Sequence, residues 1–150
     1  MQTLKRGLVA TFLLFSPLVQ AEGLQDQLTA FFAEKLAGFS DDVTVTVRTP
    51  PNLYPTCDQP SFSVVGFTKL WGNVNVLARC ANEKRYLQVA VQATGNYVVA
   101  AVPIARGSVL QTNSVTLKRG RLDQLPPRTM LEINQAQDAV SLRDVAPGQP

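Results

Sequence analysis

The sequence contains no histidine, and this absence removes several classes of active site. Serine or cysteine nucleophiles activated by histidine are excluded, and the commonest metal ligand is missing. No glycine-rich nucleotide loop and no calcium-binding loop occurs. Asp41 and Asp42 form the only adjacent carboxylate pair, but neighbours on an extended segment point to opposite faces. A serine–lysine mechanism stays open from sequence; we nevertheless expect a protein that is not an enzyme and needs no cofactor or metal.

Beyond its first residues the chain lacks any apolar run long enough to cross a membrane. The apolar run near the start, from Gly7 to Leu18, follows Lys5 and Arg6 and precedes Val19-Gln20-Ala21, which places small or short residues where a signal peptidase cuts. It is shorter than the roughly 20 residues of a membrane span and has the pattern of a secretory signal. We therefore expect a signal peptide over residues 1–21, cleavage between Ala21 and Glu22, and a soluble periplasmic chain with no membrane insertion.

A large excess of charge is also missing. The chain has 14 basic and 11 acidic side chains, for a formal charge of +3. Lys5 and Arg6 would leave with the signal peptide, so the exported part would carry 12 basic against 11 acidic groups. Nucleic-acid binding therefore has no electrostatic basis and is not expected.

Cysteine is scarce, and its two occurrences lie in the exported part. Export places Cys57 and Cys80 where disulfides form and persist, so a bridge between them is expected. The chain-entropy model gives about 3 kcal/mol of stabilisation for a loop of roughly 24 residues. A reactive or metal-binding thiol pair is the weaker alternative, because there is no CxxC spacing and no histidine to complete a site.

Apolar residues recur at helical spacing between positions 24 and 37. Their intervals of four, three, one and four positions place them on one side of a helix, and Gly38 follows as a natural end. The residues of this stripe are Leu24, Leu28, Phe31, Phe32 and Leu36. We expect a helix over Leu24–Ala37 that packs on the chain's own sheet, with a partner-binding role for the stripe as the alternative.

The middle of the chain alternates apolar and polar residues in the way of half-buried strands. A strand over Val43–Val47 ends before Pro50, and the proline-rich segment Pro50–Pro60 is expected to be a loop tied down at Cys57. Further strands are expected over Ser61–Lys69, Asn73–Cys80 and Arg85–Thr94, with Trp71-Gly72 joining the first two. Gly95-Asn96 indicates a turn, and we place a domain boundary near Asn96.

After Asn96 the sequence pattern is that of short strands, turns and prolines, with little sign of a helix. Tyr97–Ile104 reads as a strand broken by Pro103. The segment Ile104-Ala105-Arg106-Gly107-Ser108 recurs 41 residues later as Val145-Ala146-Pro147-Gly148-Gln149. In each copy an apolar residue enters a glycine turn, which indicates a repeated turn; coincidence is the alternative.

Two groups of side chains are candidates for contact with a partner. Lys118, Arg119 and Arg121, with Arg128 nearby, form the densest charge after the signal peptide and could meet an acidic surface. A solvated turn is the alternative reading of this cluster. Trp71, Phe67 and Tyr97 are aromatic candidates for interface anchors, or else they fill a small core.

The second part resembles a known domain. Ala101–Leu110, followed by Asn113-Ser114-Val115 and Arg119, is similar to the opening of a SAF domain, a small β-clip fold. With the signal peptide, the helix-then-strand first part and the cysteine pair, the chain resembles the flagellar basal body P-ring formation protein family, periplasmic assembly chaperones of Gram-negative bacteria. The fold implied is α+β and mostly β: an N-terminal helix packed on a small antiparallel sheet over residues 22–96, then a SAF-type β-clip domain over 97–150.

The resemblance implies that the chain assists assembly of the flagellar P-ring around the rod by binding the P-ring protein. It implies no cofactor and no small-molecule ligand. In SAF domains a second glycine turn ends in a leucine, whereas this sequence stops at Pro150. We therefore expect an incomplete β-clip that exposes apolar residues such as Val109, Leu117 and Leu131.

Two other classes of function compete with this reading. SAF domains also occur in envelope and pilus-assembly modules that contact peptidoglycan or sugar, but no aromatic residue follows Tyr97 to stack on a saccharide. An enzyme domain of the sialic acid synthase kind needs a catalytic barrel that so short a chain cannot supply.

Overall fold

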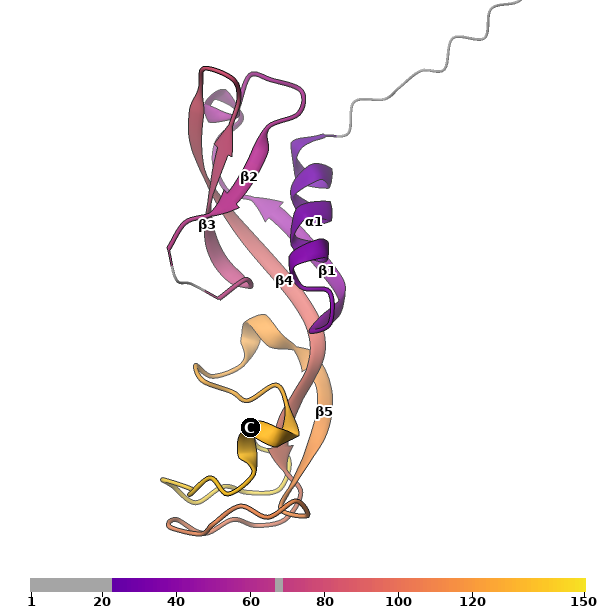
Figure 1. Cartoon of the computed structure of the whole chain (residues 1–150), viewed down its shortest axis with the longest axis vertical. Helices are drawn as coiled ribbons and strands as arrows, with labels where there is room; N and C mark the ends of the chain where they lie inside the picture. Colours follow the sequence, from indigo (N-terminus) through magenta and orange to yellow (C-terminus); the bar gives the residue numbers. More distant parts are fainter. Residues whose placement is uncertain (1–22, 67–68) are drawn as a thin grey trace, which may run out of the picture.

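The computed structural model describes residues 23–66 and 69–150 of the chain. The expected signal peptide and its cleavage site lie outside these residues. Figure 1 shows an elongated molecule in which one strand, β4, runs between two halves. Helix α1 (Leu24–Lys35) and strands β1 (Ser40–Val47), β2 (Ser61–Val64) and β3 (Gly72–Arg79) surround the first part of β4 (Lys84–Ala100). Strand β5 (Val115–Arg121) and a set of loops surround its second part.

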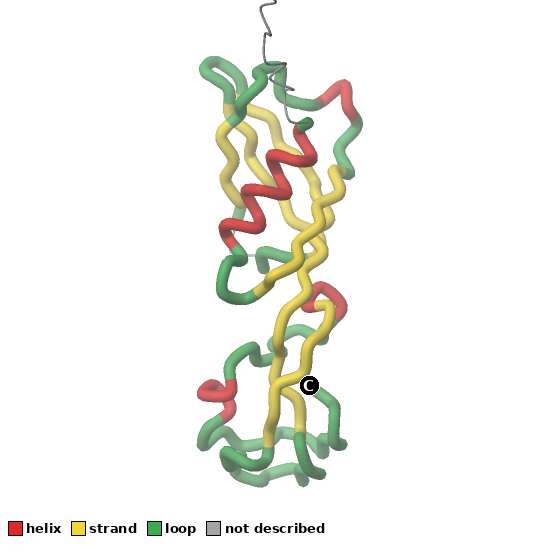
Figure 2. Tube along the Cα trace, turned by 90° about the vertical axis from the view of Figure 1, so that its right-hand side faces the viewer, coloured by secondary structure: helices red, strands yellow, loops and turns green. Residues whose placement is uncertain are grey.

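Helix α1 confirms the expected amphipathic stripe. Leu28, Phe32 and Leu36 are fully buried, while Leu24 and Phe31 are partly buried against the same core. The helix ends at Lys35, two residues earlier than expected, and Gly38 follows with a φ of +98° that favours glycine. In Figure 2 the helix lies across the strands of its half. Its buried residues belong to one core cluster with residues of the strands, so its apolar side packs on the chain's own sheet.

The strands form one antiparallel, five-stranded sheet in the order β1-β4-β3-β2, with β5 also paired to β4. Val45 lies opposite Val91, and Val76 lies opposite Leu87. All four of these side chains are fully buried or nearly so, and they belong to the core cluster that includes the helix stripe. Burial of this alternating set on one face fixes the strand register, because a slip by one residue would expose it.

Strand β4 corrects two predictions. The turn expected at Gly95-Asn96 is absent, since β4 continues through both residues to Ala100 and absorbs part of the separate strand expected over Tyr97–Ile104. The reason is spatial: a Cβ on Gly95 would lie 2.0 Å from the backbone oxygen of Phe39. Glycine is therefore needed for close approach of two backbones, where the sequence indicated a turn. The boundary predicted near Asn96 falls within this continuous strand.

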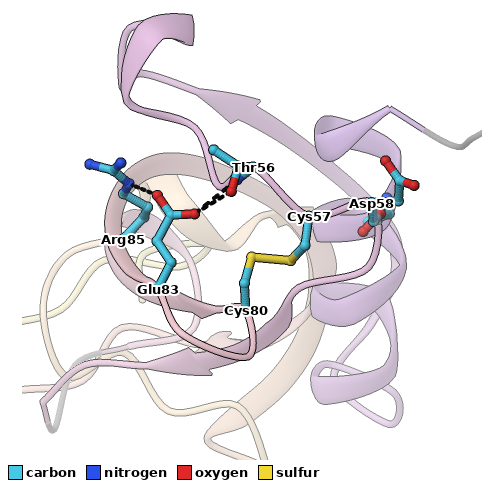
Figure 3. The surroundings of a disulfide bond; sticks show 7 residues. Thr56, Cys57, Asp58, Cys80, Glu83 and Arg85 are labelled. Carbon is cyan, nitrogen blue, oxygen red and sulfur yellow. Dashed lines mark hydrogen bonds and ion pairs between the residues drawn. A yellow bond between two sulfur atoms is a disulfide. The ribbon is translucent and has the colours of Figure 1, made fainter.

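The proline-rich loop is fastened as expected. Cys57 and Cys80 form a disulfide with a Cα–Cα distance of 5.9 Å (Figure 3). Beside it, the Glu83 carboxylate accepts hydrogen bonds from the Thr56 hydroxyl at 2.6 Å and from the Arg85 guanidinium. These bonds, that from Thr56 first, hold the pKa of Glu83 below its usual value. β2 ends at Val64, earlier than the strand expected over Ser61–Lys69.

The second half contains the repeated glycine turns. Gly107 and Gly148 both have a φ of +83°, a backbone conformation that few other residues adopt. The residues that enter the two turns pair with each other, because Ile104 and Val145 exchange two backbone hydrogen bonds of 2.9 Å. The internal repeat is thus structural, and its two copies pack together. Two short 3₁₀ helices, Leu122–Gln124 and Ile133–Ala136, complete this half.

Candidate partner-binding surface

The basic cluster predicted from the sequence lies on β5, opposite the second part of β4. Lys118 lies opposite Tyr97, Arg119 opposite Asn96, and Arg121 opposite Thr94. Because successive side chains of a strand point to opposite faces, Arg119 and Arg121 share one face and Lys118 lies on the other. The structure therefore does not join the three cations into one patch.

Both arginines of the cluster are engaged within the chain. The Arg119 guanidinium donates to the Asp41 carboxylate at 2.8 Å, which links β5 to the start of β1. The Asp41 contact raises the pKa of Arg119, and the reciprocal hydrogen bond lowers the pKa of Asp41. Both side chains are more than half exposed, so this ion pair adds little stability by itself. Lys118 is exposed and, within the described part of the chain, has no ion pair.

Arg121 is held more tightly, because its partner is nearly buried. Its guanidinium donates to Asp123 at 2.8 and 2.6 Å, and the Asp123 side chain is only 12 % exposed. The same carboxylate accepts the backbone N–H of Ala93 on β4 at 3.2 Å. The bond from Arg121 holds the pKa of Asp123 below its usual value. Arg121 and Asp123 therefore fasten the end of β5 to the middle of β4.

The aromatic candidates are divided between core and surface. Tyr97 is 8 % exposed, and its ring would meet a Cβ on Gly120 at 3.1 Å, so it fills the core at this junction. Trp71 is partly buried against the core, with the Lys69 ammonium 6.0 Å from its ring. Phe67 lies outside the described residues. Tyr97 is thus a core residue, and Trp71 keeps one exposed side.

An apolar groove in the second half was not foreseen from the sequence. It has a volume of about 520 Å³, and its lining includes Val98, Ile104, Leu110, Val115, Met130 and Val145. These residues come from β4, β5, both glycine turns and the loop before Ile133–Ala136, and no sequence period connects them. Val109 and Leu117 are 51 % and 45 % exposed, as expected. Leu131, also expected to be exposed, instead packs against the core.

Neither a metal-ligand cluster nor a membrane-spanning helix is found among the described residues. Within residues 23–66 and 69–150, no group of three or more His, Cys, Asp or Glu side chains is arranged to hold a metal ion. No helix in these same ranges has the length and apolarity needed to cross a membrane. The described surface carries the exposed Lys118, the partly buried Trp71 and the apolar groove.

Comparison with known proteins places the chain in a family. No protein-family model matches it. Over all 150 residues it is 69 % identical to the flagella basal body P-ring formation protein FlgA of Salmonella typhimurium, and it covers 68 % of that protein. The chain belongs to the FlgA family. The FlgA of Escherichia coli K12 is 61 % identical over the same 150 residues.

A crystal structure of Salmonella FlgA in a closed form resembles the fold of this family member. The TM-score is 0.81 at 71 % identity, over 85 % of this chain. The chain spans 64 % of that crystallised FlgA chain, slightly less than two thirds of its length. The helix, the antiparallel sheet and the mostly-β character predicted from the sequence agree with this FlgA fold.

Proposed function

We propose that this chain acts in the periplasm as a chaperone in flagellar P-ring formation, by binding the P-ring protein without catalysis. The observation that carries the proposal is the 69 % identity, over the whole chain, to a protein named for P-ring formation. A protein that assists a ring to assemble needs surfaces that bind subunits rather than groups that react. The described residues fit this need, because they present a groove and unpaired cations.

Two features of the sequence and structure support the periplasm as the compartment. Residues 1–21 have the pattern of a secretory signal, and Cys57 and Cys80 are joined in a disulfide. Disulfides persist in the bacterial periplasm and are rare in the cytosol. We also propose that the chain divides near Asn96 into an N-terminal α+β domain and a SAF-type β-clip, with β4 shared between them.

Lys118, Arg119, Arg121 and Trp71 remain the contacts that the sequence favours. Lys118 could contact a partner without breaking an existing ion pair, because it is exposed and has none with a described residue. Arg119 and Arg121 would have to exchange their ion pairs with Asp41 and Asp123 for contacts with a partner. That exchange costs part of any affinity gained, because a carboxylate left behind loses its partner.

Direct binding tests the proposal. Purified P-ring protein is passed over the immobilised, disulfide-intact chain, and an unrelated periplasmic protein of similar size and net charge serves as the matched control. We expect saturable binding to the chain and none to the control. Absence of binding at the highest soluble concentration, or equal binding to both proteins, contradicts the proposal.

A further inference from the structure

One face of the N-terminal sheet is covered by α1, and most side chains of the opposite face are exposed. On β4 the alternate residues Tyr86, Gln88 and Gln92 are exposed, while Leu87, Val89 and Val91 between them are buried in the core. The alternation extends to the neighbouring strands. The side chains of this open face are Thr44, Thr46 and Arg48 near β1, Ser61 and Ser63 on β2, Asn73, Asn75, Leu77 and Arg79 on β3, and Lys84, Tyr86, Gln88, Ala90 and Gln92 on β4. All of them are exposed except Leu77, which is buried, and Ala90, which is half-buried.

The register places these side chains in rows across the sheet. Arg48 follows β1 and hydrogen-bonds through its backbone N–H to Gln88, which lies opposite Asn75 on β3. A shallow depression of about 490 Å³ lies among Arg48, Asn73, Asn75 and Gln88. The next row carries Tyr86, which is 68 % exposed. The open face thus combines cations, amides, hydroxyls and one prominent aromatic ring.

The cations of this face have no carboxylate beside them. Arg48, Arg79 and Lys84 make no ion pair with any described residue, in contrast to Arg119 and Arg121. Two acidic residues border the face. Glu83, in the turn, accepts bonds from Thr56 and Arg85. Asp42, at the far end of β1, lies opposite Thr94 on β4, ten positions along the chain from Lys84.

Two of the cations face each other in an arrangement that costs stability. Arg79 and Lys84 are direct cross-strand partners at the end of the β3–β4 ladder. Like charges directly opposite on a sheet are destabilising. Arg48 lies beside Gln88, four residues along β4 from Lys84, or about 13 Å at 3.3 Å per residue. One carboxylate cannot reach both positions, so a complementary surface needs at least two acidic groups.

We propose that this open face is a docking surface for an acidic protein surface, with Arg48, Arg79 and Lys84 as the charge contacts and Tyr86 as the anchor. The inference rests on the proposed function for the identity of the partner, and it replaces β5 as the main contact. Tyrosine and arginine are enriched at interface hot spots, and short polar side chains supply adaptable hydrogen bonds around them. A saccharide site is disfavoured, because Tyr86 is the one aromatic residue among the side chains of this face.

Charge-neutralising variants test the surface. In Arg79→Gln/Lys84→Gln we expect the Kd for the P-ring protein to rise about tenfold at low salt, and the difference to shrink at high salt as the charges are screened. Tyr86→Ser should weaken binding about tenfold at both salt concentrations, because its contribution is apolar. All three residues project from the uncovered face, and circular dichroism checks that each variant is folded.

A matched control removes the same charge elsewhere. Lys35→Gln/Arg106→Gln takes one cation from the last turn of α1 and one from the first glycine turn, and both residues are exposed. We expect less than a twofold change in Kd. Equal weakening by the two double variants would show that only net charge matters, and no weakening by either would place the contact elsewhere. Each of these results overturns the inference.

Nuclear magnetic resonance separates this inference from the proposed function. Amide shifts of the labelled chain are followed during titration with the P-ring protein, with a Glu-rich decapeptide and with a peptidoglycan fragment. Perturbation of β3 and β4 around Asn75 and Tyr86 by the decapeptide supports the docking face even if the P-ring protein does not bind. Perturbation confined to β5 or the apolar groove overturns the inference, as does a response of the open face to peptidoglycan alone, or no response to any probe.

Discussion

The close approach at Gly95 gives the sharpest prediction about stability. A methyl group at this position would lie 2.0 Å from the backbone oxygen of Phe39 and 3.2 Å from a methyl carbon of Leu122, which is itself 1 % exposed. Relief of the first contact requires a backbone shift of about 1 Å where β1 and β4 begin to pair. Overpacking usually costs about 1–3 kcal/mol, and a clash with backbone belongs at the upper end. We expect Gly95→Ala to lower the free energy of unfolding by about 3 kcal/mol.

Gly120→Ala is the matched control, because Gly120 lies opposite Gly95 on β5. A methyl group there meets the Tyr97 ring at 3.1 Å, and a ring edge can move by a few tenths of an ångström. The expected loss is about 1 kcal/mol or less, toward the lower end of the overpacking range. Urea unfolding followed by circular dichroism measures both variants. Equal losses, or a change at Gly95 within about 0.5 kcal/mol of zero, would refute the packing argument.

Three further predictions concern the disulfide, the half-buried ion pair between Arg121 and Asp123, and local stability. Cys80→Ser should lower the free energy of unfolding by about 2–5 kcal/mol in urea titrations; alkylation of two thiols in the native oxidised protein would contradict the bridge. Asp123→Asn should lower the free energy of unfolding at neutral pH, because the ionised carboxylate pairs with Arg121. The difference between the variant and the parent chain should vanish as the pH falls through the depressed pKa of Asp123, below the ordinary value of 3.8; a difference independent of pH would refute this. Hydrogen exchange should be slowest over residues 85–94, which pair with β1 and β3, and faster over 122–142, which contain no strand; uniform protection would contradict it.

Local patterns were enough to predict most of the N-terminal half. The spacing of Leu28, Phe32 and Leu36 predicted the buried side of α1, and the alternation over Val43–Val47 predicted the buried side of β1. Both features depend on the period of one element, which a single sequence reveals. The disulfide followed from the expected compartment and from the absence of other cysteines.

Features that depend on distant residues were missed. Gly95 carries the same local signal whether it makes a turn or lets two backbones approach, and only the position of Phe39 decides between them. No pattern in the sequence indicated that the β5 arginines form ion pairs, because the partner of Arg119 is Asp41, which lies 78 positions away in the chain. The open face could not be predicted from the sequence either, because Arg79 and Lys84 become neighbours only through the register of β3 and β4.

The central claim is that this member of the FlgA family acts in P-ring formation, and basal bodies test it most directly. The chain is expressed in a strain that lacks its own family member, and P-rings on isolated rod structures are counted by electron microscopy. Because the chain spans 68 % of Salmonella FlgA, a second arm carries the same chain joined to the unmatched part of that relative. The account predicts P-rings in the joined arm, above the count in the empty strain; a count at the level of the empty strain in both arms would contradict it.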